Sequence, residues 1–199
     1  MSTATMEKIS SMLDAATQMG AVQLTVSDLD RSIAFYETIL GFQLHDRSGG
    51  QAHLGAGGPT LVELVELKGA RHVTHHSGLY HFAILTPSRF ALAQVLRNLV
   101  KHQVQIGGSD HLVSEAIYLS DPDGNGIEMY RDRPRHEWQY ENGLPVLGGL
   151  PLDYQGILRI GRRSRAVDRT GRSYGNGSHA PARQQFAGGG RFLSPSRGL

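Results

Sequence analysis

The sequence contains no cysteine among its 199 residues, which excludes a disulfide framework, a thiolate metal site and a thiol nucleophile. Aromatic residues make up only 7% of the chain, and no apolar run approaches the roughly 20 residues that span a bilayer. Residues 1–18 lack the basic start and apolar run of a signal peptide and are expected to form an N-terminal extension. Because 39% of the residues are hydrophobic, a packed core is expected. We predict a cytoplasmic protein with no membrane partner.

Charge is divided unevenly along the chain, although the formal net charge is only +2. Residues 1–158 carry 11 Lys and Arg against 17 Asp and Glu, whereas residues 159–199 carry nine Arg, one Asp and no Lys. Hydrophobic periodicity stops at 159 and Arg, Gly and Ser dominate, so we predict a disordered tail. The alternative is an arm that binds nucleic acid. The tail has few aromatic residues and no amphipathic stripe, so we expect no nucleic-acid partner.

Residues 19–68 show the order strand, helix, and three further strands. Val22–Val26 alternates apolar and polar residues, as a half-buried strand does. The pair Ser27-Asp28 can cap a following helix, and Gly41 suits the residue just beyond its end. Glycine pairs separate the strand-like runs that follow, at 42–46, 51–55 and 60–66.

Residues 78–133 repeat this order. Tyr80–Leu85 predicts a strand, and Pro87-Ser88 can begin a helix. A short strand is expected at 103–106, where Gly107-Gly108 stops it. Two more strands are expected after the glycines, at 115–119 and 127–130. The chain thus contains two βαβββ repeats with a period of roughly 58 residues, and we predict an α+β fold. Residues 136–158 are expected to form a linker-like segment.

Three segments carry a resemblance to a known family. They read VSDLDRSIAFYETILGF, GLYHFAIL and HLVSEAIYLSDPDGNGIEMYRDRPR. Together they resemble the vicinal oxygen chelate superfamily, which contains glyoxalase I, bleomycin-resistance proteins and type I extradiol dioxygenases. The similarity is greatest to the amino-terminal module of two-module catechol 2,3-dioxygenases. It implies that residues 19–135 form one module, in which the two repeats build a curved, cleft-forming mixed sheet.

The resemblance also implies a divalent metal, which is Fe(II) in the ring-cleaving members and is held by two His and one Glu. His81 and Glu128 stand at the second His and the Glu positions, and Gly126 leaves room beside them. The first His position is Ala21 here, and a methyl group cannot coordinate a metal. The residues alone leave another interpretation open, in which His81 is a buried histidine bonded to a backbone carbonyl and Glu128 is a solvated acid.

Two further residues are candidates for catalysis. Tyr118 stands ten residues before Glu128, and in extradiol enzymes a tyrosine at this spacing hydrogen-bonds the bound catecholate; a tyrosine of the strand core is the alternative. His111 lies in a loop and has the right chemistry for an acid–base group, or is an exposed loop histidine. The pair His75-His76 is interpreted as a solvated loop.

The resemblance implies an extradiol-type oxidoreductase that acts on a small aromatic substrate such as a catechol, with O₂. Because Ala21 removes one ligand, we expect the activity of the single chain to be impaired, and a homodimer is one way to complete the site. A metal-free module that binds a small aromatic molecule or drug, as bleomycin-resistance proteins do, is the alternative. An inactive fragment is the third reading.

The tail carries a pattern that suggests an altered reading frame. With permitted synonymous codons, residues 174–198 read one base later can give TVMGHMHLHVSNLQAAVDFYHRVVG. This text aligns without a gap to MGAVQLTVSDLDRSIAFYETILG at 19–41. Our hypothesis is that a frame slip near 158–166 replaced a second module with this tail.

Overall fold

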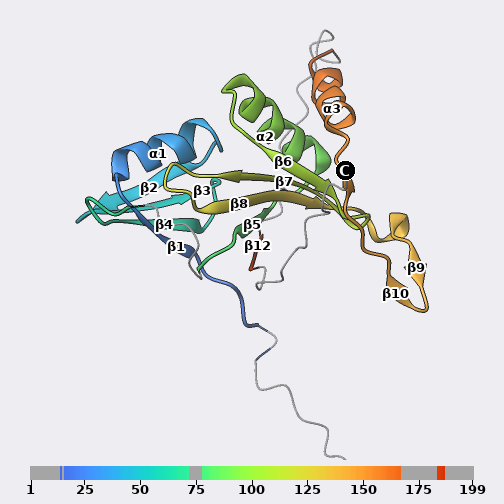
Figure 1. Ribbon diagram of the computed structural model, residues 1–199, viewed down its shortest axis with the longest axis horizontal. Helices are drawn as coiled ribbons and strands as arrows, with labels where there is room; N and C mark the ends of the chain where they lie inside the picture. The colour runs from blue at the N-terminus through green and yellow to red at the C-terminus, as the bar shows by residue number, and fades with distance from the viewer. Residues whose placement is uncertain (1–13, 15, 72–77, 167–182, 187–199) are drawn as a thin grey trace, which may run out of the picture.

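The structure is a computed structural model of the chain that describes residues 14, 16–71, 78–166 and 183–186. It contains two main sheets with helices packed on them, and a small projecting hairpin (Figure 1). Within these described residues, every helix is too short or too polar to cross a membrane. The pair His75-His76 lies outside the described residues.

The first repeat forms a four-stranded sheet with one covering helix. Its elements are β1 (Val22–Val26), α1 (Leu29–Thr38), β2 (Gln43–Ser48), β3 (Gln51–Gly55) and β4 (Thr60–Glu66). The strand order is β1-β4-β3-β2, in which β1 and β4 are parallel and the other pairs antiparallel. The carboxylate of Asp28 caps α1 by accepting from the Arg31 backbone N–H, and Gly41 follows the helix with a φ of 76°.

The second repeat has the same topology. Its elements are β5 (Phe82–Leu85), α2 (Arg89–Lys101), β6 (Gly107–Asp110), β7 (Ser114–Ser120) and β8 (Gly126–Asp132). They run in the order β6-β7-β8-β5, with β5 parallel to β8 as β1 is to β4. The mixed sheets and the repeated βαβββ order confirm the α+β fold that the sequence predicted.

One hydrophobic core joins the two repeats. Strand residues of both sheets meet apolar side chains of α1 and α2, and most are at least nine-tenths buried. Two polar contacts reinforce this packing. Asp123, between β7 and β8, accepts from the Ser27 hydroxyl at 2.6 Å and from Arg31 at 3.0 Å. Asn98 of α2 donates to the carbonyl of Thr38, at the end of α1. The repeats therefore form one unit.

The strand predicted at 103–106 is wrong in its position. The structure places β6 at Gly107–Asp110, so the two glycines lie inside the strand and do not stop it. Gln103 has a φ of 56° and ends the α2 turn instead. A Cβ on Gly108 would lie 2.5 Å from the Tyr154 hydroxyl, so the side chain of a later helix packs close against the strand at this glycine.

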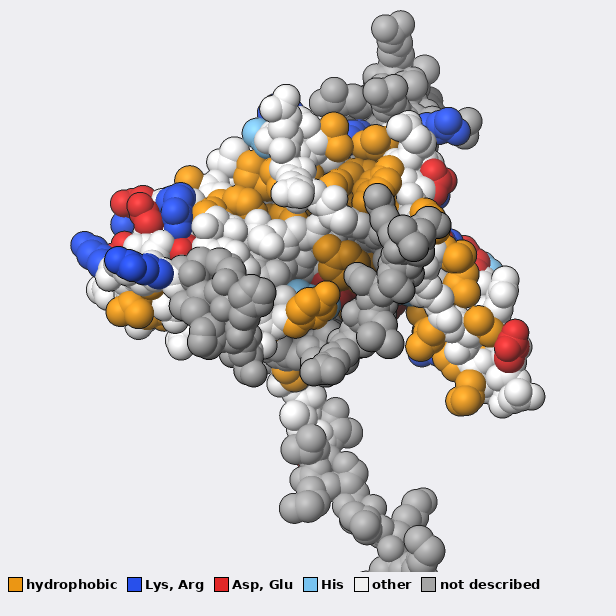
Figure 2. Space-filling view, in the orientation of Figure 1, with side chains coloured by type: hydrophobic (Ala, Val, Ile, Leu, Met, Phe, Trp, Pro, Cys, Tyr) orange, Lys and Arg blue, Asp and Glu red, His pale blue; other side chains and the backbone are white. Residues whose placement is uncertain are grey.

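The segment expected to be a linker, 136–158, contains ordered elements. After a 3₁₀ turn at Arg135–Glu137, β9 (Tyr140–Glu141) and β10 (Leu144–Pro145) form a hairpin, and β11 (Leu150–Pro151) pairs with β6. Figure 2 shows apolar side chains on the projecting hairpin, where Leu144 and Leu147 are each 70% exposed. Leu152 and Ile157 join the main core.

The helix α3 (Tyr154–Ala166) packs on α2 and runs across residue 159, where the sequence predicted that the tail begins. Beyond it, β12 (Arg183–Phe186) pairs antiparallel with β5. The rest of the tail lies outside the described residues.

Candidate active site

Three neighbouring strands bring the predicted site residues onto one face of the second sheet. In the strand register Tyr118 of β7 and Ala83 of β5 both stand beside Glu128 of β8. His81 immediately precedes β5 and is 8% exposed. Because side chains alternate along a strand, His81, Tyr118 and Glu128 share this face, and the apolar residues between them point to the core.

The four candidate residues form a continuous chain of contacts. His81 Nε2 lies 3.0 Å from Glu128 Oε2, and the Tyr118 hydroxyl donates to Glu128 Oε1 at 3.0 Å. His111 Nε2 lies 2.9 Å from the same hydroxyl. His111 Nδ1 lies 2.9 Å from the carbonyl oxygen of Gly148. The structure therefore brings together all four residues that the sequence singled out.

The donors and acceptors in this chain can be counted. The Gly148 carbonyl only accepts, so Nδ1 of His111 donates to it. The single proton of the Tyr118 hydroxyl goes to Glu128, and the same hydroxyl lies within hydrogen-bond distance of Nε2 of His111. The Gly148 carbonyl, His111, Tyr118 and Glu128 thus form one chain of hydrogen-bonding groups.

The Tyr118 hydroxyl is held in its protonated form. Burial raises the pKa of Tyr118 well above its ordinary value, and the charge of Glu128 and the hydrogen bond to it add to the effect. A phenolate beside this carboxylate is disfavoured by charge repulsion and by loss of water. Tyr118 is thus a hydrogen-bond donor across the whole range of neutral pH.

His81 has an unsatisfied ring nitrogen. Its Nε2 is buried and makes no hydrogen bond to a described residue, although it lies at an ion-pair distance of 3.0 Å from Glu128 Oε2. Gly126 lies directly beneath it, where an added Cβ would stand 2.2 Å from the Tyr80 carbonyl oxygen and 3.0 Å from His81 Cβ. The Tyr80 ring packs against the imidazole at 4.9 Å between centroids.

A divalent metal fits this site in part. An unpaired imidazole nitrogen beside a carboxylate is the donor set that such metals use. The third expected position is Ala21, just before β1, which has no donor atom. Over residues 14, 16–71, 78–166 and 183–186, no group of three His, Cys, Asp or Glu residues could hold a metal. Further ligands would have to come from water or from a bound molecule.

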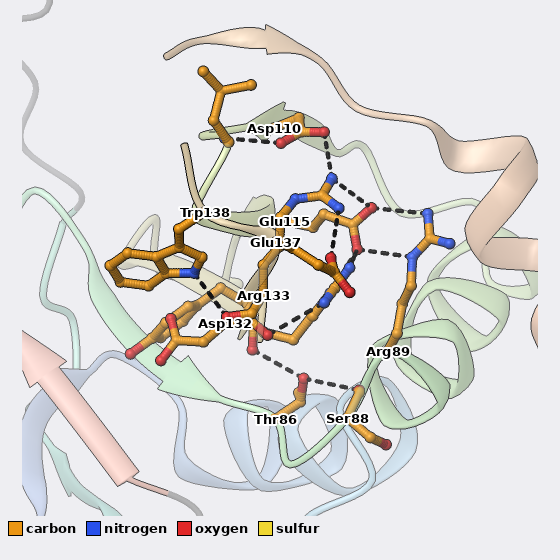
Figure 3. A network of polar contacts seen from close by, with 12 residues as sticks. Thr86, Ser88, Arg89, Asp110, Glu115, Asp132, Arg133, Glu137 and Trp138 are labelled. Atoms are coloured by element: carbon orange, nitrogen blue, oxygen red, sulfur yellow. Dashed lines mark hydrogen bonds and ion pairs between the residues drawn. The ribbon is translucent and has the colours of Figure 1, made fainter. Parts of the chain in front are cut away.

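A second polar network fixes the loop that carries His111 (Figure 3). At its centre is Glu115, which is 1% exposed and accepts from Arg89 and Arg131 at 2.6–2.8 Å. Arg133 contacts the same carboxylate and bonds Asp110 Oδ2 at 2.6 Å. The other oxygen of Asp110 accepts from the backbone N–H of Leu112. Asp110 is therefore tied to Arg133, the residue after β8, and Leu112 is tied to Asp110.

Two tyrosines on this face were missed by the sequence reasoning. Tyr80 packs on His81, and Tyr130 follows Glu128 by two residues on β8. Burial raises the pKa of Tyr130 to about 12, with the charges of Asp132 and Glu128 contributing. The alternation Glu128–Tyr130 was a usable signal, because residues two apart on a strand share a face.

Comparison with known proteins agrees with this geometry. Residues 18–129 match the model of the Glyoxalase/Bleomycin resistance protein/Dioxygenase superfamily. The chain is 44% identical over 146 residues to catechol-2,3-dioxygenase of Bacillus subtilis, covering 71% of this chain and 51% of that protein. It is 31% identical over 109 residues to metallothiol transferase FosB of Lysinibacillus sphaericus, covering 53% of this chain and 76% of that protein. The chain thus spans about half the length of the first relative.

Solved structures show the same fold. A glyoxylase/bleomycin resistance protein/dioxygenase domain from Frankia sp. EAN1pec superposes with a TM-score of 0.52 at 24% identity, covering 59% of this chain and 98% of that domain. A glyoxalase/dioxygenase from Nostoc punctiforme superposes with a TM-score of 0.52 at 20% identity, covering 64% of this chain and 100% of that chain. From the matched residues, the repeated βαβββ topology and these folds together, the chain belongs to the glyoxalase/bleomycin resistance/dioxygenase superfamily.

Proposed function

We propose that the second sheet carries an extradiol-type site, which binds a catechol together with a divalent metal. The observation that supports this most is the buried Nε2 of His81, which lacks a hydrogen-bond partner among the described residues and lies beside the carboxylate of Glu128. These two residues would hold the metal. When bound, Fe(II) would supply adjacent coordination positions for the two catechol oxygens and for O₂.

The other residues of the site act on the substrate and its protons. Tyr118, held protonated, can redirect its single hydrogen bond from Glu128 to a substrate oxygen placed beside that carboxylate. His111 lies on the far side of Tyr118 and can take up or return a proton through its hydroxyl. The carbonyl of Gly148 keeps Nδ1 protonated, so that Nε2 faces the site.

A second function, binding of a small aromatic molecule without turnover, is favoured by Ala21. With two protein ligands, the metal affinity of the free chain is expected to be low. A catechol would add two oxygen ligands, so the extradiol function requires that metal and catechol bind together. The binding function requires only that the aromatic ring binds.

The deciding experiment restores the missing ligand. Ala21→His should raise Fe(II) affinity about tenfold or more, the scale on which metal-site partners act. Ala34→His, which adds a histidine to the exposed face of α1, is the matched control. Fe(II) binding and ring cleavage of catechol are measured anaerobically and then with O₂, with His81→Ala as the negative variant.

The outcomes separate the two functions. Ring cleavage by the native chain or by Ala21→His, lost in His81→Ala, supports the extradiol proposal. Catechol binding that neither depends on Fe(II) nor changes in His81→Ala supports the binding function. If Ala21→His binds Fe(II) no better than Ala34→His, position 21 does not face the site and the proposed metal centre is wrong.

A further inference from the structure

A second buried polar atom on this face lacks a partner. The hydroxyl of Tyr130 has no hydrogen-bond partner among the described residues, although the residue is only 6% exposed. A hydroxyl removed from water without a new hydrogen bond destabilises the folded protein, so such groups are rare and call for an explanation. Two orphaned polar atoms, one each from His81 and Tyr130, thus lie on the same sheet face on either side of Glu128.

The floor between these groups is made of small side chains. In the strand register Ala83 stands beside Glu128, and Ala116 stands beside Tyr130. Tyr118 and Leu85 pack against this group from the sides. The opposite face of the same strands carries large core residues such as Ile117, Ile127 and Met129. Ala83 and Ala116 are both buried, and their methyl groups put no bulky side chain between Glu128 and Tyr130.

The spacing suits a single small ring. Two residues along a strand span about 6.5–7 Å, so the Tyr130 side chain leaves β8 about that far from Glu128. A six-membered ring bound at its oxygens near His81 and Glu128 would carry its opposite substituent toward Tyr130. The hydroxyl can then hydrogen-bond that substituent.

The charges nearby restrict what the substituent can be. The carboxylates of Glu128 and Asp132 share the face of Tyr130, because each stands two residues from it on β8. A carboxylate on the ligand would be repelled there, whereas a neutral acceptor such as a carbonyl would not. The cation nearest in sequence, Arg131, points to the other face and is bound to Glu115.

We propose that Tyr130 is a specificity-determining residue, which donates a hydrogen bond to an uncharged polar substituent on the ring of the ligand, opposite the end held at His81 and Glu128. This inference rests on the proposed aromatic-binding function of the site. It extends that function by naming a substrate class: ring compounds with a neutral acceptor para to one of the oxygens, in preference to ring carboxylates.

The test compares three probes by calorimetry on the full chain, with and without Fe(II) and without O₂. They are catechol, 3,4-dihydroxybenzaldehyde and 3,4-dihydroxybenzoate. We expect the aldehyde to bind the native chain more tightly than the benzoate. In Tyr130→Phe the ratio of aldehyde to catechol affinity should fall about threefold to tenfold, the range of one hydrogen bond. Tyr140→Phe, whose side chain is half exposed on the hairpin, should leave this ratio unchanged.

A stability measurement separates a ligand role from a structural one. Because the hydroxyl is orphaned in the free protein, Tyr130→Phe should unfold at the same temperature as the native chain or higher. A lower unfolding temperature would show that the hydroxyl has a structural partner and would overturn the inference. An unchanged affinity ratio in Tyr130→Phe would overturn it while the proposed function stands. If none of the three probes binds, both are wrong.

Discussion

At the scale of single residues, the site depends on one close approach between backbones. Gly126 lies against the Tyr80 carbonyl and His81, where an added methyl group would overlap the backbone. The residue therefore sets the position of the imidazole relative to Glu128. A side chain introduced at position 126 would therefore move His81 without itself contacting a ligand.

Gly126→Ala is expected to lower the free energy of unfolding by about 1–3 kcal/mol, because the overlap is with backbone and cannot be relieved by a side-chain rotation. It should also weaken Fe(II) binding, since His81 must move away from Glu128. Gly58→Ala is the matched control, because a Cβ there meets nothing within 4 Å. Urea unfolding and metal titration of both variants check the prediction, and equal behaviour of the two would contradict it.

The sequence could predict which residues share the face but not all of their contacts. Tyr118 and Glu128 follow from strand alternation and the family motif. The bond from His111 to the carbonyl of Gly148 joins residues 37 apart, and it depends on the pairing of β11 with β6. That pairing has no local signal, because two-residue strands carry no periodicity.

At the scale of elements, the buried Glu115 organises the end of the second sheet. It comes from β7 and gathers arginines from α2, β8 and the residue after β8. A buried carboxylate is stable there only because these cations and their hydrogen bonds replace water. The network therefore holds α2 to the sheet and ties the loop of His111.

Glu115→Gln should destabilise the protein by about 3–5 kcal/mol, because it leaves arginine charges partly buried without their counter-charge. Glu141→Gln, on the exposed hairpin, should change stability by less than about 0.5 kcal/mol. Thermal and urea unfolding measure both. A Glu115→Gln variant as stable as Glu141→Gln would show that the cluster contributes little.

The contact between the repeats is expected to depend on pH through Asp123. Burial alone would raise the pKa of Asp123, but hydrogen bonds from Ser27 and the charge of Arg31 outweigh it and hold the pKa below its ordinary value. A lowered pKa in the folded state contributes stability above the unfolded value, near 3.8, and this stability is lost as the pH falls through the folded value.

Asp123→Asn should therefore cost about 1–2 kcal/mol at pH 7, and the difference from the native chain should shrink below about pH 4. Asp30→Asn, at an exposed ion pair with Arg47, is the control and should cost under about 1 kcal/mol. Unfolding curves between pH 3 and 7 provide the measurement. A difference that is constant over this range would exclude the role of the charge.

Element positions were predicted best where alternation is regular. The strands at 22–26, 51–55 and 60–66 have the predicted bounds. β6 was misplaced because glycine was read as a stop, whereas both glycines pair with β7 and Tyr154 of α3 packs close to Gly108. The low strand propensity of glycine reflects only the local chain, and at β6 contacts with the rest of the fold override it.

At the scale of the whole molecule, residues 1–158 are acidic and residues 159–199 are rich in arginine. The matched residues 18–129 lie within the acidic part, and the chain covers 51% of the Bacillus relative. We infer that a frame slip near 158–166 produced the arginine-rich sequence that follows. With permitted synonymous codons the shifted frame can read GHMHLHV, which has a histidine where residue 21 is alanine, and this supports the inference.

The coding DNA tests the inference directly. Read one base later from codon 170 onward, it should encode GHMHLHV and continue without an early stop. Restoring that frame should give a longer protein, with a mass that intact-protein mass spectrometry can measure. A shifted frame with stops, or without GHMHLHV, would refute the frame slip.

The hydrogen bond between His111 and Gly148 has a consequence for protein engineering. Gly148 lies outside the residues that match the family, so the tautomer of His111 is set by a segment that a domain boundary drawn at 129 would discard. A chimera joined at that boundary would inherit His81, His111, Tyr118 and Glu128, yet without Gly148 the His111 imidazole could turn and present either nitrogen. Recombination beyond residue 151 keeps the contact between His111 and Gly148, so the hairpin and β11 belong to the same structural unit as the candidate site.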